Sequence, residues 1–332
     1  MELTMGWWIG FNVFVLAMLA LDLGVFHRKA HEVRFKEAIT WSAVWIALAL
    51  LFGVGIHQGW FGGYDEAVRG LRAKEFFAGY LVEKALSVDN VFVFAMIFGY
   101  FAVPPAYQHR VLFFGILGAL ILRAIFIFGG AWLVAHFEWT LYIFAVFLIV
   151  TGIKMIWMKD KKIEPENNPL IRLTRRIMPV TTEYHGQNFF IRQDGRLFAT
   201  PLLLVLLFVE TTDLLFAIDS IPAILILTQD TFIVYTSNVF AILGLRALYF
   251  ALAGFMQMFA YLSYGLSAIL IFIGGKMFYQ AAVKSMTGVE TKFPIEWSLG
   301  IIGAILVIAV IASLIRGRKK PTAPGTGEPA VQ

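Results

Sequence analysis

The stretch YLVEKALSVDNVFVF, residues 80–94, decides how the whole chain is interpreted. Large apolar residues surround four polar ones, Glu83, Lys84, Asp89 and Asn90. The apolar flanks are typical of a membrane-spanning helix, yet a charge at the centre of such a helix costs at least about 2.5 kcal/mol on insertion scales. Charges in this position are therefore candidates for a functional site inside a membrane.

The composition predicts an all-α polytopic membrane protein. Of the 332 residues, 59% are hydrophobic and 15% are charged, whereas soluble proteins carry about 25% charged residues. Apolar runs of roughly 20 residues match helical spans, since barrel strands would alternate instead. The chain has no cysteine, which excludes disulfides and thiolate metal sites. The basic residues lie in loops that flank the membrane, so we expect no nucleic-acid partner.

About nine transmembrane helices are predicted. The expected spans are residues 5–26, 37–58, 75–101, 109–135, 138–158, 198–228, 232–252, 258–280 and 295–315. With the N-terminus outside, the inside loops hold 17 Lys and Arg and the outside loops hold 5. Positive residues favour the cytoplasmic side, so this bias predicts an N-out, C-in orientation.

These spans divide the chain into six segments. They are two N-terminal helices (1–74), a first three-helix repeat (75–158), a basic cytoplasmic loop (159–197), a second three-helix repeat (198–280), a ninth helix (281–316) and a Pro- and Gly-rich tail (317–332). Alternation around Asp194-Gly195 predicts a β-hairpin in the loop. We interpret it as a ribbon that closes the cytoplasmic face, with a regulatory or partner-binding role as the alternative. The tail is expected to be disordered.

The repeat is visible as three pairs of matching segments in the same order. EKALSVDNV (83–91) matches DLLFAIDSI (213–221), LRAIF (122–126) matches LRALY (245–249), and LIVTGIKM (148–155) matches LIFIGGKM (270–277). Each unit holds three spans, an odd number, so the two halves have opposite topology. Inverted repeats are the architecture of many secondary transporters, whose site lies near the midplane at the repeat interface. The alternative is a duplicated scaffold with no transport role.

Six acids within the predicted spans form the candidate site. They are Asp22, Glu83, Asp89, Glu210, Asp213 and Asp219, against the cations Lys84, Arg123 and Arg246. The excess of negative charge suits a bound cation. Arg123 and Arg246 are expected to be counter-ions that hold carboxylates. As an alternative to metal binding, Glu83 could pair with Arg246 or a neighbour. Asp22, near the end of its span, has an interfacial role as its alternative.

Residues 83 and 89, like 213 and 219, would point in different directions on a straight helix. Because Pro222 removes a backbone hydrogen bond, we predict that the spans at 75–101 and 198–228 are interrupted and that the six acids converge. Asn90, Ser220 and Thr211 are candidate auxiliary oxygen ligands. Such an oxygen donor set fits hard divalent cations such as Mn²⁺, Ca²⁺ or Mg²⁺ and fits Cu⁺ or Zn²⁺ poorly.

At these residues the chain resembles a known family. The segments 75–94 and 179–224, together with LALDLGVFHRKAHEV in the first span, closely resemble the TerC family of integral membrane proteins, in particular its alkaline-inducible bacterial manganese exporters. The resemblance runs to about residue 280. It implies a fold similar to the lysine-exporter superfamily and export of Mn²⁺, with Glu83, Asp89, Glu210, Asp213, Asp219 and Asp22 holding the metal.

We therefore expect a multi-pass protein of the bacterial cytoplasmic membrane that exports Mn²⁺, with Ca²⁺ as a second candidate ion. It is not expected to be an enzyme or to hold a tight cofactor; its partners are the metal cation and the lipid bilayer. Crowded carboxylates bind protons more tightly, so proton exchange is compatible with the site without being established by it. The alternatives are a non-transporting accessory protein that helps load metal into secreted proteins or fold them, and an exporter of cationic amino acids.

Overall fold

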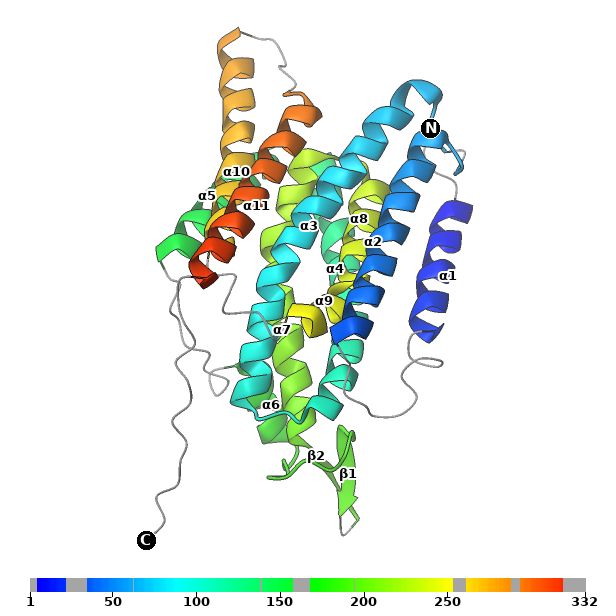
Figure 1. The fold of residues 1–332 in the computed structure, drawn as a ribbon, viewed down its shortest axis with the longest axis vertical. Coiled ribbons are helices and arrows are strands. Elements are labelled where there is room, and N and C mark those ends of the chain that lie inside the picture. Colours follow the sequence, from blue (N-terminus) through cyan, green and yellow to red (C-terminus); the bar gives the residue numbers. More distant parts are fainter. Residues whose placement is uncertain are drawn as a thin grey trace.

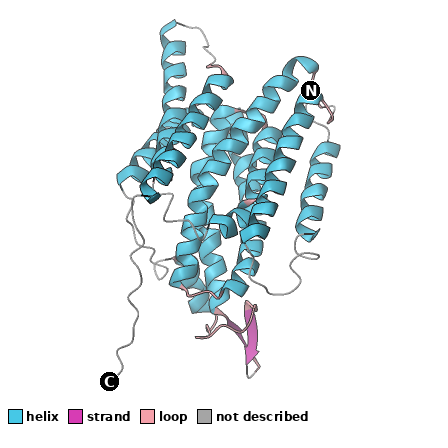
Figure 2. Ribbon diagram, viewed as in Figure 1, coloured by secondary structure: helices cyan, strands magenta, loops and turns pink. Residues whose placement is uncertain are grey.

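The chain folds into a bundle of long helices with one β-hairpin at its end (Figures 1 and 2). The computed structural model describes residues 5–21, 35–61, 63–137, 139–157, 168–193, 195–252, 261–287 and 293–318. Its first half consists of α1 (Met5–Leu21), α2 (Phe35–Gln58), α3 (Glu66–Tyr100), α4 (Pro105–His136) and α5 (Thr140–Trp157). Its second half consists of α6 (Pro169–Ile177), β1 (Phe190–Gln193), β2 (Arg196–Ala199), α7 (Pro201–Leu227), α8 (Thr231–Leu243), α9 (Leu245–Leu252), α10 (Leu262–Thr287) and α11 (Ile295–Arg318).

The helices are those of a polytopic membrane protein, as the composition predicts. Within the described residues, seven helical segments are long and apolar enough to cross a membrane: α2, α4, α5, α7, α8 with α9, α10 and α11. The apolar helix α1 is shorter, at 17 residues. Large apolar side chains such as Ile125, Ile143 and Ile308 are exposed on the bundle surface, where lipid would cover them. The all-α membrane class is confirmed, and the count of nine spans stays a prediction.

The helices surround a buried central segment formed by α8 and α9, of which 89% is buried. Helix α3 packs against α8, and α7 packs against α4, while α5 runs along α10. In Figure 1, α1 and α2 lie at one edge of the bundle, and α5, α10 and α11 lie together at the opposite edge. The charged and polar residues of the candidate site are therefore brought together where α3, α4, α7 and α8 meet.

Two apolar clusters pack in the bundle, and a polar zone separates them. Along α3 the first cluster ends at Ala85 and the second begins at Val91. Along α7 the second cluster ends at Val209 and the first resumes at Ala217. The candidate site therefore lies between two apolar layers, which strengthens electrostatic interactions inside it by excluding water.

The prediction that the spans at 75–101 and 198–228 are interrupted is wrong. Helix α3 is continuous over 35 residues and α7 over 27, with Pro222 inside α7. Proline removes only one backbone donor, so one missing bond within a well-packed helix does not end it. A break lies instead at Gly244, between α8 and α9. There the Lys84 ammonium donates to the carbonyl of Ala241 at 3.4 Å, close to the end of α8.

The loop that the sequence places in the cytoplasm contains the antiparallel pair that its sequence predicts. Strands β1 and β2 are in register from Phe190 opposite Ala199 to Gln193 opposite Arg196, which leaves a two-residue turn. Gly195 has φ of +77°, a conformation that glycine adopts without strain. Asp194 lies outside the described residues, as do Asp22 and most of the predicted tail. The hairpin projects from one end of the bundle, as Figure 2 shows.

Candidate functional site

Arg123 of α4 lies at the centre of the polar zone and bridges two acids from different helices. It forms ion pairs with Glu83 of α3 and with Asp213 of α7. Its Nε and Nη2 donate to the two carboxylate oxygens of Asp213 at 3.4 and 3.2 Å, and its Nη1 donates to Glu83 Oε1. All three side chains are at most 2% exposed. Arg123 is thus a counter-ion for the two acids that occupy matching positions in the repeat.

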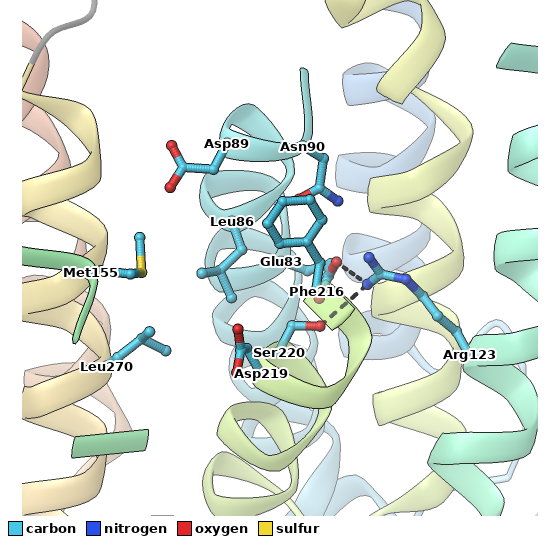
Figure 3. Close-up of a pocket in the computed structure, with 10 residues that line it drawn as sticks. All are labelled: Glu83, Leu86, Asp89, Asn90, Arg123, Met155, Phe216, Asp219, Ser220 and Leu270. Atoms are coloured by element: carbon cyan, nitrogen blue, oxygen red, sulfur yellow. Dashed lines mark hydrogen bonds and ion pairs between the residues drawn. The ribbon is translucent and has the colours of Figure 1, made fainter. Parts of the chain in front are cut away.

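Neutral side chains complete the surroundings of Arg123. Its Nη1 also lies 3.3 Å from Ser220 Oγ and 3.2 Å from Asn238 Oδ1, and Asn90 donates to Asp213 at 3.5 Å. Figure 3 shows the guanidinium group pointing toward Glu83 and Ser220. Desolvating a charge inside a protein is costly unless partners and hydrogen bonds compensate it. These contacts supply that compensation for the guanidinium group.

A cavity of about 100 Å³ lies beside this cluster. It is lined by Glu83, Leu86, Asp89, Asn90, Arg123, Met155, Phe216, Asp219, Ser220 and Leu270 (Figure 3). Two oxygen atoms of its lining, Glu83 Oε2 and Asn90 Oδ1, are buried without a hydrogen-bond partner in the described chain. Buried oxygen atoms without donors are costly unless something binds them, and a hard cation is a suitable ligand.

Asp89 and Asp219 occupy matching positions of the predicted repeat, and each accepts a hydrogen bond from a hydroxyl on another helix. Asp89 of α3 accepts a hydrogen bond from Ser263 of α10 at 3.4 Å. Asp219 of α7 accepts one from Thr151 of α5 at 3.3 Å. Each of these acids, on the first helix of one predicted repeat, therefore accepts a hydrogen bond from a hydroxyl on the third helix of the other predicted repeat. Both acids are half-buried and line the same cavity.

Glu210 lies apart from this cavity, against α4. A Cβ atom built on Gly118 would overlap the Glu210 carboxyl group, so glycine makes room for that side chain. Arg246 and Asp213 line a second, much smaller cavity, which includes neither Glu83 nor Asp89. The hydroxyl of Thr211 donates to the carbonyl of Leu207 within its own helix. Arg246 and Thr211 are therefore not lining residues of the larger cavity.

The acids do not form a single ligand cluster in the described part of the chain. Three of them, Glu83, Asp89 and Asp219, line one cavity, while no three acidic or histidine side chains there are close enough to hold an ion together. The reason is geometric: residues six apart on a continuous helix face different ways. Asp22 lies outside the described residues. The assignment of these acids as metal ligands stays a prediction.

The structure adds site residues that the sequence interpretation did not include: Asn238, Thr151, Ser263 and Gly118. Asn238 lies in the polar run Thr236-Ser237-Asn238 inside an apolar span, and that run was a usable signal. Isolated hydroxyls such as Thr151 and Ser263 are common in membrane helices and gave no distinct signal. The glycine is recognisable only from the side chain that it faces.

A second polar network joins the helices at the end of the bundle opposite the hairpin. Arg72 of α3 contacts Glu75 at 2.6 Å and Asp230, at the start of α8, at 3.3 Å. Tyr64 donates to Asp230 at 3.0 Å, and Thr228 donates to Glu75 at 2.8 Å. Burial, and then the charge of Asp230, raise the pKa of Tyr64 above its usual range, so the phenol remains a donor. The network ties α3 to the loop between α7 and α8.

This fold and its charged interior define a class: polytopic helical membrane proteins with a buried ionic centre. The family model "Integral membrane protein TerC family" matches residues 69–321, and the chain belongs to that family. A membrane protein of Myxococcus xanthus, named "Uncharacterized membrane protein STKORF319", is 52% identical over 96% of this chain and 94% of its own length.

Two further relatives carry a more specific name. Proteins of Escherichia coli K12 and Photorhabdus laumondii, both named "Putative membrane-bound redox modulator Alx", are 47% and 45% identical. The matches cover 92% of this chain and 92% of the relative from Escherichia coli, and 95% of this chain and 96% of that from Photorhabdus laumondii. No solved structure matches the chain.

Proposed function

We propose that this chain is a secondary transporter of the bacterial cytoplasmic membrane that exports Mn²⁺, with Ca²⁺ as a second candidate ion. The observation that carries the proposal is the cavity lined by Glu83, Asp89 and Asp219, in which buried oxygen atoms lack donors. Oxygen ligands of this kind match hard divalent cations. Carboxylates from two helices would approach the ion together when the helices move.

The packing of the two repeats supports alternating access. The first helix of each repeat packs on the second helix of the other, as α3 does on α8 and α7 on α4. At the α5–α10 contact, the matching residues Gly152 and Gly274 both allow close approach of the backbones. This reciprocal packing of each half on the other is what is expected of inverted repeats that rock against each other around a shared site.

Different residues of the site are assigned different roles in transport. Asp89 and Asp219 are half-buried and are proposed to bind the ion first, since Ser263 and Thr151 hold their carboxylates at the cavity. Glu83 and Asn90 supply buried oxygen atoms that have no hydrogen-bond partner among the described residues and could therefore coordinate the ion. Asp213, which Arg123 engages through both oxygens, positions the guanidinium group. Glu210 lies on α7 apart from the cavity, so any part it has in ion binding would be separate from that of the cavity residues.

The printed name of the relatives from Escherichia coli and Photorhabdus laumondii refers to redox modulation. The present chain contains no cysteine, so it cannot exchange disulfides itself. Export of Mn²⁺ would change the content of a redox-active metal in the cell, and this change would alter the redox state of the cell. Redox modulation is therefore compatible with export of Mn²⁺. The alternative of an accessory protein that binds metal without transporting it predicts binding but no flux.

Reconstitution tests the proposal directly. Purified protein in liposomes is expected to move Mn²⁺ across the bilayer, followed by quenching of a trapped fluorescent indicator. Asp89→Asn and Asp219→Asn are expected to lower the rate at least about tenfold, because each removes a charge at the cavity. Glu66→Gln, an exposed acid at the start of α3, is the matched control and should transport normally.

Three outcomes separate the candidates. Binding of Mn²⁺ without flux would favour the accessory role. Flux that neither cavity substitution changes would overturn the assigned site while leaving transport in place. Flux of Ca²⁺ that equals that of Mn²⁺ would show that the cavity does not discriminate between the two ions.

A further inference from the structure

Arg123 differs from an ordinary structural counter-ion in its position. It is a permanently charged side chain at the centre of the molecule, and it lines the same cavity as Asp89 and Asp219. Its contacts with two matching acids join the first helices of both repeats. The guanidinium group therefore lies where a transported cation would meet Glu83.

The two acids hold Arg123 unequally. Asp213 receives two donors of the guanidinium group, one on each oxygen, whereas Glu83 receives one donor on Oε1. Glu83 Oε2 is buried and has no hydrogen-bond partner among the residues described. Two-point pairing holds a carboxylate more firmly than one-point pairing. Glu83 is thus the acid that is easier to release from Arg123.

Arg123 also has neutral oxygen atoms to hold it when Glu83 leaves. The same Nη1 that contacts Glu83 lies within 3.3 Å of Ser220 Oγ and 3.2 Å of Asn238 Oδ1. The guanidinium group can therefore lose Glu83 and stay bonded to Asp213, Ser220 and Asn238. A divalent ion entering the cavity would repel the guanidinium group and attract the released carboxylate.

We propose that Arg123 is an internal, tethered cation that competes with the transported ion for Glu83. When the cavity is empty, Arg123 pairs with Glu83 and neutralises it, which lets the empty carrier change its orientation. When the ion binds, Glu83 turns from Arg123 to the ion. The inference rests on the proposed transport function and assigns Arg123 the return step of the cycle, in which no ion is carried.

The test separates two modes of transport in the same liposomes. Net transport requires the empty carrier to return, whereas exchange of labelled for unlabelled Mn²⁺ on the two sides does not. Arg123→Gln is expected to lose net transport at least about tenfold and to keep exchange within about twofold of wild type. Its affinity for Mn²⁺, measured by titration of the purified protein, is expected to rise about tenfold, because the competing cation is gone.

Arg123→Lys provides the conservative variant. The ammonium group keeps the charge without the two-point fit to Asp213, so net transport is expected to recover in part. If the glutamine variant does not fold, the lysine variant decides the matter, since it should slow net transport more than exchange. Folding is checked by a single symmetric peak in size-exclusion chromatography.

A purely structural role gives a different pattern. Equal loss of net transport and exchange in folded variants, or unchanged affinity for Mn²⁺ in Arg123→Gln, would overturn the inference. If wild-type protein moves no Mn²⁺ in either mode, the proposed function fails instead. In that case the titration alone still tests whether Arg123 competes with the metal.

Discussion

Glu210 and Gly118 form a pair in which a small residue on one helix makes room for a charge on another. The carboxyl group of Glu210 occupies the space where a side chain at position 118 would lie. Glu210 is half-buried in the polar zone between the two apolar clusters, and the matching position in the predicted first repeat is Tyr80. The acid is therefore particular to the second repeat, and its position depends on one glycine of α4.

The substitution Gly118→Ala is expected to displace the Glu210 carboxyl group and to lower Mn²⁺ transport about tenfold, because ligand positions tolerate small shifts poorly. The same liposome assay measures it. Gly129→Ala is the matched control, since it lies on the same helix and its added Cβ meets no atom within 4 Å. Equal rates in both variants would show that transport does not depend on the placement of Glu210.

Asp230 performs two tasks that one substitution can separate. Its Oδ1 accepts the backbone N–H groups of Phe232 and Ile233 as the N-cap of α8, and its Oδ2 receives Arg72 and Tyr64. Asparagine also caps helices well but carries no charge. Asp230→Asn therefore keeps the cap and weakens the network that ties α3 to the α7–α8 loop.

We expect Asp230→Asn to let the outer end of the bundle open more often. Because the chain has no cysteine, a single Leu270→Cys in the cavity lining reports access without background. A maleimide that does not cross membranes, added outside, should label it several-fold faster with Asp230→Asn than without it. Asp65→Asn, an exposed neighbour of the network, serves as the control. Unchanged labelling would mean that the network does not close this end.

At the scale of elements, the contact between α5 and α10 depends on glycines that match across the repeat. A Cβ on Gly152 would lie 2.8 Å from Ile271 Cγ1 and 2.9 Å from the Ser267 carbonyl oxygen. A Cβ on Gly274 would lie 2.7 Å from the carbonyl oxygen of Ala145. Backbone atoms cannot turn aside as a side chain can, so any side chain at Gly274 must push the helices apart.

Gly274→Ala is accordingly expected to destabilise the protein by about 1–3 kcal/mol, the usual cost of overpacking. The neighbouring Gly275→Ala meets no atom within 4 Å and should be neutral or stabilising by up to about 1 kcal/mol through helix propensity. Thermal unfolding in detergent compares the two. The predicted order would be contradicted if Gly275→Ala were the less stable variant.

At the scale of the whole molecule, inverted repeats require the two halves to enter the membrane from opposite sides. The sequence predicts that the segment before α3 and the segment after α10 face outside, whereas the loop that contains the hairpin faces the cytoplasm. In the described structure α3 and α7 pack against each other as long helices.

Single cysteines measure that orientation in intact cells. Glu66→Cys and Met286→Cys should react with an impermeant maleimide added outside, while Glu183→Cys should react only after the membrane is permeabilised. All three positions are exposed in the structure. Labelling of Glu183→Cys from outside would contradict the N-out topology, and opposite results for Glu66→Cys and Met286→Cys would contradict the count of spans between them.

The class of protein, the long helices, the hairpin and the family were all determined by the sequence, because hydrophobic length, turn residues and motif spacing are local properties. Which charges meet was decided only by the tertiary structure. Pro222 indicated a broken helix, but packing kept α7 intact and the break fell at Gly244. Within each of α3 and α7 the two acids six residues apart therefore have different partners: Glu83 and Asp213 pair with Arg123, whereas Asp89 and Asp219 accept hydrogen bonds from Ser263 and Thr151 in the cavity that Glu83 also lines. The rotation and packing of the helices determine these partners, and the linear order of the residues specifies neither the rotation nor the packing.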